Sequence, residues 1–364
     1  MQRVLVVGMS ANPGGLEAVV MNYYRKLDKS RIQFDFLITT PHMAYESEAK
    51  ALGARIFSIT ARRVNPLRFT QELHGFFAER GTDYNILWAN LCSLVNIDYL
   101  KAAARYGIPR RIVHCHNSRN MNDALRGVLH DIHRLSIRRY ATDYWSCSDD
   151  AAEWFFGRGI CSNPKYRYIP NGVDPFEYRF DESVRIAKRK ELGVEDGQIL
   201  IGNVGRLHSQ KNQSFLLESF LTLPNQDHRY HLIIIGDGGL RTELEHRIDS
   251  LDLNESVSLL GVRHDVKELY NAMDLFVLPS LYEGVSIALL EAQSNGLPCL
   301  ISDSLSDEGI VNGNVHKVSI ENTDAWQAAI RQTDINRLSD NKIPGSDFDI
   351  NKQVMNFTQD MLGN

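Results

Sequence analysis

A repeated pattern limits what this chain can fold into: a short apolar run, a turn that contains glycine or proline, and then a stretch with helical periodicity. The run at residues 4–7 has the length of a strand and no polar position, so both faces of that strand would be buried. Strands that alternate with helices form parallel sheets covered on both faces. The chain is therefore predicted to be a doubly wound α/β protein. Further strand candidates lie at residues 34–38, 54–59, 86–88, 111–116, 144–147, 168–169, 199–204, 231–235, 257–260, 275–278 and 299–301.

The length of the chain favours two domains, because 364 residues are many for a single one. The sequence IPNGVDP at residues 169–175 is typical of a turn and linker, and the alternation of strands and helices starts again after it. We therefore expect an N-terminal domain at residues 1–170 and a C-terminal domain at residues 171–345. Residues 346–364 end in a short amphipathic pattern, and this C-terminal helix could cross back to the N-terminal domain.

Composition excludes several classes of protein. The net charge is -5, so the basic excess typical of nucleic-acid-binding proteins is absent and no nucleic-acid partner is expected. The five cysteines are odd in number and none has C-x-x-C spacing, which argues against a disulfide framework or a zinc site and fits the cytoplasm. The N-terminal apolar run is too short for a signal peptide, and no run reaches the ~18 apolar residues of a transmembrane helix.

The first candidate site follows the strand at residues 199–204 and contains Gly205, Arg206 and Lys211. In open parallel sheets, ligands bind beyond the carboxyl ends of the strands. Arg206 offers a planar fork of donors and Lys211 a compact point charge, so together they suit a diphosphate. A surface turn with two exposed bases is an equally good interpretation of this motif alone.

The second candidate site contains two glutamates eight residues apart, Glu283 and Glu291. A helix that starts after Gly284 would span them, and eight residues are close to two helical turns, so both could share one face. The start of that helix would offer free N–H groups to a phosphate, at Gly284, Val285, Ser286 and Ile287. Glu291 could then accept hydrogen bonds from a ribose diol, and Glu283 from sugar hydroxyls.

The alternative is an amphipathic helix with both acids in solvent. The run at residues 287–290 is apolar enough to bury the helix, and Glu291 would be buried with it. A buried carboxylate needs hydrogen-bond partners. The burial of Glu291 therefore favours a functional interpretation.

Two weaker signals lie in the N-terminal half. The loop at residues 8–15, which contains Gly14 and Gly15, is not G-x-G-x-x-G and does not support a nicotinamide site. His114 and His116 alternate to one face of a strand end, but no third metal ligand is evident nearby. A structural histidine is the commoner case, and His116 is nearer the tip of the strand.

Taken together, these segments resemble the retaining glycosyltransferases of family 4, which have the GT-B architecture of two facing Rossmann-like doubly wound domains with an interdomain cleft. The resemblance covers nearly the whole chain and rests on five motifs in the right order. The strongest motif is E-x7-E, from Glu283 to Glu291. The others lie at residues 14–15, 114–118, 169–174 and 205–212.

The resemblance implies roles for the matching residues of the C-terminal half. Arg206 and Lys211 would bind the donor diphosphate and stabilise the leaving nucleotide. Glu291 would hold the ribose, and Glu283 would contact the transferred sugar. The segment that contains Arg263 would contact the base, largely through its backbone.

In the N-terminal half, which would be the acceptor side, the resemblance implies that Gly14 and Gly15 let the chain approach the phosphates. His116 would lie near the sugar. No D-x-D motif stands at a strand end in this half, which is consistent with a site that needs no metal and no cofactor besides the donor.

The implied activity is retaining transfer of a sugar from a nucleotide diphosphate sugar, with UDP as the expected nucleotide, to a glycan or lipid-linked glycan. Capsular or exopolysaccharide biosynthesis is the implied setting. Two alternatives remain open: a nucleotide-sugar epimerase of the same architecture, for which no base is evident, and a non-catalytic partner subunit of a glycosyltransferase.

Two basic amphipathic segments raise the hypothesis of peripheral contact with the cytoplasmic face of the inner membrane. Helices packed into the core with basic outer faces are an equally good interpretation. The first segment, at residues 119–140, carries Leu125, Val128, Leu129, Ile132 and Leu135 beside Arg126, Arg134, Arg138 and Arg139. The second carries Arg62, Arg63 and Arg68 near Leu67, Phe69, Phe76 and Phe77.

Overall fold

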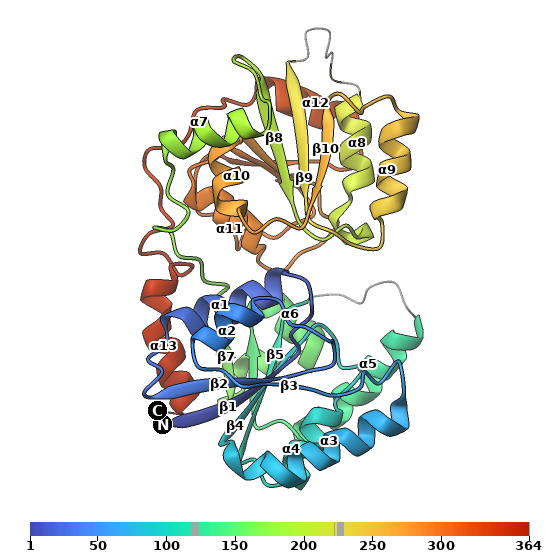
Figure 1. Cartoon of the computed structure of the whole chain (residues 1–364), viewed down its shortest axis with the longest axis vertical. Coiled ribbons are helices and arrows are strands. Elements are labelled where there is room, and N and C mark those ends of the chain that lie inside the picture. The colour runs from blue at the N-terminus through green and yellow to red at the C-terminus, as the bar shows by residue number, and fades with distance from the viewer. Residues whose placement is uncertain (118–123, 222, 224–228, 364) are drawn as a thin grey trace. The chain divides into compact units, whose positions relative to one another are not determined.

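A computed structural model describes residues 1–117, 124–221, 223 and 229–363. The chain divides into two compact units (Figure 1). The N-terminal unit comprises residues 1–172 together with residues 350–364, and the C-terminal unit comprises residues 173–349. The expected α/β class is therefore observed in both halves of the chain.

The N-terminal unit contains a parallel sheet of seven strands in the order β3-β2-β1-β4-β5-β6-β7. In the central pairing, Val6 of β1 lies opposite Phe36 of β2 and Trp88 of β4. The strands are β1 (Gln2–Val7), β2 (Ile32–Ile38), β3 (Ile56–Ser58), β4 (Ile86–Leu91), β5 (Arg110–Cys115), β6 (Asp143–Ser146) and β7 (Tyr166–Tyr168). The helices are α1 (Gly15–Lys26), α2 (Glu46–Ala51), α3 (Pro66–Arg80), α4 (Asp98–Arg105), α5 (Ala124–Ser136), α6 (Asp149–Phe156) and α13 (Ile350–Leu362), with short 3₁₀ turns η1 (Gly81–Asp83), η2 (Ile137–Arg139) and η3 (Ile160–Ser162).

Both faces of this sheet are buried, as the apolar run of β1 predicts. Leu5 and Val7 are fully buried in a core that they share with Phe77 of α3 and Phe155 of α6. Successive residues of a strand point to opposite faces, so Val6, which is also fully buried, packs on the other side of the sheet.

The C-terminal helix α13 belongs to the N-terminal unit, although the chain passes through the whole C-terminal unit before reaching it. The ring of Phe357 stacks on Tyr23 of α1 with centroids 4.1 Å apart. The same ring meets Trp88 and Trp145 edge-on, at 5.4 and 5.6 Å. Arg110 also donates a hydrogen bond of 2.7 Å to the carbonyl of Met361. An aromatic cluster thus anchors the last helix to the first sheet.

The C-terminal unit contains a second parallel sheet, of six strands in the order β10-β9-β8-β11-β12-β13. Helices α8, α9 and α12 contribute to the core on one face, while α10 and α11 contribute to the core on the other (Figure 1). The strands are β8 (Ile199–Val204), β9 (Tyr230–Ile235), β10 (Val257–Gly261), β11 (Leu275–Leu278), β12 (Cys299–Ser302) and β13 (Val315–Val318). The helices are α7 (Glu182–Glu191), α8 (Gln213–Leu221), α9 (Arg241–Ser250), α10 (Val266–Ala272), α11 (Ile287–Ser294) and α12 (Thr323–Gln332), with the 3₁₀ turn η4 (Ser209–Lys211).

Each sheet has a point at which the direction of strand addition reverses. In the N-terminal unit this point lies between β1 and β4, and in the C-terminal unit between β8 and β11. Loops that leave two such strands run to opposite faces, so they open a crevice at the carboxyl ends where ligands bind. The strand order therefore directs attention to the loops after β8 and β11.

No helix in the described ranges is long and apolar enough to cross a membrane.

The role of Phe357 can be tested by truncation. We expect Phe357→Ala to destabilise the protein by about 3–5 kcal/mol, because it leaves a cavity among Tyr23, Trp88 and Trp145. Met355→Ala on the same helix should have little effect, since Met355 is 68% exposed. Thermal unfolding of the full chain measures both changes, and equal losses in the two variants would contradict the anchoring role.

Candidate active site

The loop after β8 is folded so that Lys211 lies against the end of the strand. Its turn η4 begins after His208, whose ring Nδ1 accepts a hydrogen bond of 3.2 Å from the backbone N–H of Gln210. A Cβ at Gly205 would lie 3.1 Å from Cε of Lys211. The missing side chain of Gly205 therefore lets the aliphatic stem of Lys211 pack on the backbone.

The loop after β11 brings Glu283 directly to Lys211. The Nζ of Lys211 lies 2.5 Å from Oε1 of Glu283, and their side chains are only 16% and 11% exposed. Two motifs that lie 72 residues apart in the sequence thus form one ion pair at the reversal point of the sheet.

Side-chain amides hold the two loops together around this pair. The side-chain amide of Gln210 donates a hydrogen bond of 2.8 Å to the carbonyl of Tyr282, and the backbone carbonyl of Gln210 accepts one of 2.8 Å from the N–H of Leu281. Asn212 donates a hydrogen bond of 3.2 Å to the carbonyl of Pro279. The sequence indicated none of these contacts, because amide side chains in loops carry no periodic signal.

The structure corrects the expected position of the helix between the two glutamates. Helix α11 begins at Ile287, with Ser286 as its N-cap in extended geometry. Glu283 therefore precedes the helix, and the two glutamates do not share a helix face. Gly284, Val285 and Ser286 also precede the helix, so among the four expected phosphate-binding positions Ile287 alone stands in its first turn.

The predicted burial of Glu291 is confirmed, since this residue is 8% exposed. Its carboxylate accepts a hydrogen bond of 2.7 Å from the hydroxyl of Tyr178 and one of 3.0 Å from the hydroxyl of Tyr270. Both tyrosines were missed in the sequence. They lie 113 and 21 residues from Glu291, in segments with no evident relation to the motif.

Arg206 lies on the exposed side of the same site. Its carbonyl accepts a hydrogen bond of 3.0 Å from Gln213, while its guanidinium has no hydrogen bond or ion pair with any residue that the structure describes. The two basic residues expected at the diphosphate therefore have different environments. Lys211 is neutralised by Glu283, and Arg206 presents its charge to solvent.

The glycine-rich loop after β9 supports the backbone beside Arg206. A Cβ at Gly236 would lie 2.0 Å from the carbonyl oxygen of Gly205, and one at Gly238 would lie 2.3 Å from that of Leu207. The backbone of Leu207 also accepts from Leu240 and donates to Asp237. This loop lacks the third glycine of a dinucleotide fingerprint, and its glycines serve to let two backbones meet.

The side chain of Arg263 is held within the C-terminal unit by acids. It pairs with Asp265 at 2.5 Å and with Glu191 at 3.0 Å, and Lys188 pairs with the same two acids. Arg263 therefore holds the pKa of Asp265 well below its usual value. This side chain is committed to structure, and the expected contact of its backbone with a base stays a prediction.

The two glycines of the N-terminal motif lie at the start of α1, and their expected approach to the donor phosphates stays a prediction. Gly14 is the N-cap of α1 and Gly15 its first residue, and a Cβ at Gly15 would meet no atom within 4 Å. Gly8 is the constrained position, because its φ is +107° and a Cβ would lie 1.9 Å from the carbonyl oxygen of Asn90. The loop is fixed further by Glu17, which accepts a hydrogen bond of 3.0 Å from the N–H of Ser10.

The two histidines of β5 and the following loop lie together, as alternation predicts. The ring centroids of His114 and His116 are 4.2 Å apart, and His114 is fully buried between Trp88 and Trp145. The Nε2 of His116 lies 2.9 Å from Oδ1 of Asn90. Burial lowers the pKa of His116 to about 3, so its ring is neutral at physiological pH.

Within the residues that the structure describes, no three His, Cys, Asp or Glu side chains are grouped so as to hold a metal ion. Ser118, the last residue of the histidine motif, and residues 119–123, the start of the first basic segment, lie outside the described residues.

Two Rossmann-like units, with polar loops at the reversal points of their sheets, define the GT-B class of glycosyltransferases. Residues 184–345 match the family described as glycosyl transferases group 1, and residues 14–172 match the glycosyl transferase 4-like domain. The chain belongs to this family of glycosyltransferases, family 4.

Three known proteins illustrate the relationship. EpsF of Bacillus subtilis strain 168, a protein named as a glycosyltransferase, is 34% identical over 315 residues. The match covers 84% of this chain and 80% of that protein. An Escherichia coli UDP-Gal:α-D-GlcNAc-diphosphoundecaprenol α-1,3-galactosyltransferase is 35% identical over 176 residues, 47% of this chain and 46% of that protein. The structure of HepE from Anabaena in complex with UDP and glucose has a TM-score of 0.80 at 18% identity, with 100% of both chains covered.

The support of the Arg206 loop by glycine can be tested with two neighbouring substitutions. Gly238→Ala should destabilise the protein by about 1–3 kcal/mol, because its Cβ would press on the carbonyl of Leu207. Gly239→Ala is the matched control, since nothing lies within 4 Å of a Cβ there. Thermal unfolding distinguishes them, and an unchanged midpoint in Gly238→Ala would show that the two loops can separate at no cost.

Proposed function

We propose that this glycosyltransferase moves a sugar from a UDP-linked donor to a glycan or lipid-linked glycan, with retention of configuration at the transferred carbon. The observation that carries the proposal is the Lys211–Glu283 ion pair at the reversal point between β8 and β11. A cation at that place suits the diphosphate of a donor, and a carboxylate beside it suits the hydroxyls of the sugar.

The chemistry needs groups that stabilise a leaving nucleoside diphosphate, because negative charge develops on it as the sugar departs. Arg206, with its guanidinium in solvent, and Lys211, held by Glu283, supply positive charge to the diphosphate. The start of α11 adds backbone N–H groups at Ile287 and the two residues after it. Preorganised groups such as Lys211 and the N–H groups of α11 are worth several kcal/mol in a transition state, so the proposal needs no metal and no further cofactor.

Lys211 and Glu283 neutralise each other in the structure, and this bears on the order of events. A diphosphate that binds beside Lys211 would share its Nζ with Glu283. Glu283 would then be oriented by Lys211 toward the sugar that is attached to the same diphosphate. The pair therefore couples recognition of the phosphate to recognition of the sugar.

The relatives support the choice of donor and acceptor. The Escherichia coli relative is named for UDP-galactose and for an acceptor linked to diphosphoundecaprenol, and the Anabaena structure holds UDP and glucose. We carry these to the present chain as part of the proposal, together with a setting in capsular or exopolysaccharide assembly. Retention of configuration is carried from the family resemblance in the same way.

The proposal extends to contact with the cytoplasmic face of the inner membrane, through α5. Four apolar residues spaced at three, four and three along this helix are exposed: Leu125 (71%), Val128 (56%), Ile132 (55%) and Leu135 (86%). An exposed apolar stripe of this kind on a helix with basic residues is typical of helices that lie in a membrane interface.

A basic pocket of about 710 Å³ adjoins the end of this stripe. Arg134, Arg138 and Arg158 line it together with Trp154, and Glu153 is the acidic residue among its lining residues. This excess of positive charge favours an anionic lipid surface as the partner of α5. The second segment contributes less, because Phe69 and Phe77 are buried in the core.

The donor site can be tested by neutralising its lysine. Lys211→Met should lower kcat roughly 10²–10³-fold, because the leaving diphosphate loses a preorganised cation. The measurement is release of free UDP from UDP-sugars in the presence of acceptor glycan. Lys267→Met, which removes a surface lysine paired with Glu177, should leave the rate unchanged.

The same assay separates the alternatives. An epimerase would interconvert nucleotide sugars without acceptor and without release of UDP, and a non-catalytic subunit would do neither alone. Unchanged UDP release by Lys211→Met would refute the assignment of the donor site.

The membrane contact is tested by flotation with vesicles. We expect binding to vesicles that contain phosphatidylglycerol and little binding to pure phosphatidylcholine. Ile132→Ser with Leu135→Ser should reduce flotation several-fold, because it interrupts the apolar stripe. Ile186→Ser, at an exposed apolar residue of α7, is the control. Absence of wild-type binding to anionic vesicles would contradict the proposal.

A further inference from the structure

The carboxylate of Glu291 is held from two sides by tyrosines on different segments. Tyr270 of α10 is fully buried, and its hydroxyl lies 3.0 Å from Oε2 of Glu291 and 3.2 Å from the carbonyl of Ala288. Tyr178, half-buried in the segment before α7, approaches the other oxygen at 2.7 Å. The rings of the two tyrosines meet edge to face at 6.0 Å. Each carboxylate oxygen thus has its own hydroxyl donor.

The direction of these hydrogen bonds follows from the environment of Tyr270. Its burial, and then the nearby Glu291, raise the pKa of the Tyr270 hydroxyl well above its usual value. The hydroxyl therefore keeps its proton and donates, and the carboxylate accepts. A carboxylate has about four acceptor positions, so two hydroxyls do not exhaust its capacity for further donors.

The backbones of both tyrosines are themselves fixed by Arg337. This guanidinium donates to the carbonyl of Tyr270 at 3.0 Å and also to Oδ1 of Asn295. The amide of Asn295 in turn donates a hydrogen bond of 2.7 Å to the carbonyl of Tyr178. Arg337 lies over the ring of Phe180, 4.2 Å from its centroid. One arginine thus connects the two segments that carry the hydroxyls.

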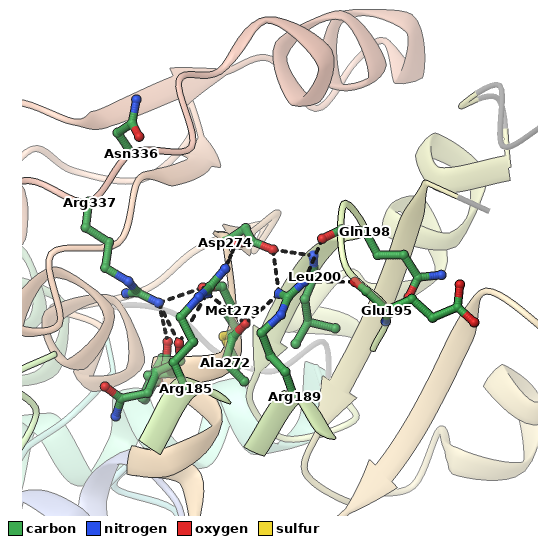
Figure 2. A network of polar contacts seen from close by, with 12 residues as sticks. Arg185, Arg189, Glu195, Gln198, Leu200, Ala272, Met273, Asp274, Asn336 and Arg337 are labelled. Carbon is green, nitrogen blue, oxygen red and sulfur yellow. Dashed lines mark hydrogen bonds and ion pairs between the residues drawn. The ribbon is translucent and has the colours of Figure 1, made fainter. Parts of the chain in front are cut away.

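A wider polar network keeps the end of α10 in place. Figure 2 shows Arg185, Arg189 and Arg337 directed toward residues 272–274. Arg185 and Arg189 each pair with one oxygen of Asp274, at 2.5 and 2.9 Å, and Arg337 donates to the carbonyl of Met273 at 2.6 Å. Cations at a helix C-terminus satisfy its last carbonyls. The helix that carries Tyr270 is therefore rigid at the end nearest this residue.

We propose that Tyr178 and Tyr270 are positioning residues that orient the Glu291 carboxylate toward the ribose diol of the donor nucleotide. This inference rests on the proposed function, in which Glu291 binds that ribose. The tyrosines fix the rotation of the carboxylate and do not themselves contact the nucleotide. Loss of either hydroxyl would leave one carboxylate oxygen with one donor fewer and would let the group turn away from the diol. The two tyrosines thereby set the preference of the enzyme for ribonucleotides over 2′-deoxyribonucleotides.

The test compares two probes, UDP and 2′-deoxy-UDP, whose Kd values for the full-length protein are measured by isothermal titration calorimetry. The wild-type protein should bind UDP about tenfold or more tightly than 2′-deoxy-UDP, since a hydrogen bond to a charged group is lost. Tyr270→Phe should weaken UDP binding several-fold and 2′-deoxy-UDP binding much less, so that the ratio of the two Kd values falls toward one. Glu291→Gln should lower the ratio as well.

The controls separate a positioning role from a loss of structure. Tyr178→Phe tests the same idea at a half-buried residue, so it serves if Tyr270→Phe folds poorly. Tyr24→Phe removes a comparable buried hydroxyl in the N-terminal unit, one that donates to Leu52, and should leave the ratio unchanged. Thermal unfolding without ligand reports the stability of each variant.

Each outcome bears on one proposal. If the wild-type protein binds the two probes equally, or binds neither, the assignment of Glu291 to ribose in the proposed function fails. If the wild-type protein discriminates and Glu291→Gln does not, while both tyrosine variants keep the wild-type ratio, the positioning role fails. The positioning role also fails if the tyrosine variants lose affinity for both probes by the same factor.

Discussion

Burying the carboxylate of Glu291 is the constraint on which much of the C-terminal unit depends. An ionised carboxylate away from water is costly unless hydrogen-bond donors replace the water. Here the donors come from segments distant in the chain, Tyr178 and Tyr270. These must be brought to one place, and Arg337 does so through carbonyl and amide contacts. The Glu291 carboxylate thus explains why the segment with Tyr178, helix α10 and the segment with Arg337 are held together, although they share no local sequence pattern.

The other half of the donor site is built without regular secondary structure. Loops after β8, β9 and β11 meet at the carboxyl ends of their strands, where glycines and side-chain amides join them. Gly236 and Gly238 allow backbones to touch, while Gln210 and Asn212 bridge loops with their amides. Precise placement of Lys211 and Glu283 is therefore a property of the loops and of the sheet that aligns them.

Much of the fold could be predicted from the sequence, because buried parallel strands are continuous apolar runs and their alternation with helices implies that they are parallel. The order of the strands within each sheet was not predicted. The edge strand β13 was missed, since its sequence VHKV is half polar and only partly buried. The start of α11 was also misplaced. The helix was predicted to begin after Gly284, whereas Ser286 has extended geometry and occupies the N-cap position.

The site was predictable only where a residue type carries its own chemistry. Lys211, Glu283 and Glu291 could be chosen because charged residues beside apolar runs are conspicuous. Their partners could not, since a tyrosine 113 residues away is unremarkable in sequence and is identified only when the chain has folded. The ion pair between Lys211 and Glu283 was not foreseen either, because each had been assigned its own part of the donor.

The return of α13 to the first sheet affects the order in which the two units fold as the protein is synthesised. The C-terminal unit is one uninterrupted stretch of chain, so its folding requires no residue after 349. The N-terminal unit is synthesised first but lacks Phe357, whose ring fills the space beside Tyr23 and Trp88, until the very end. The half that emerges first is therefore the half that is finished last, because its aromatic cluster is completed only when α13 packs on it.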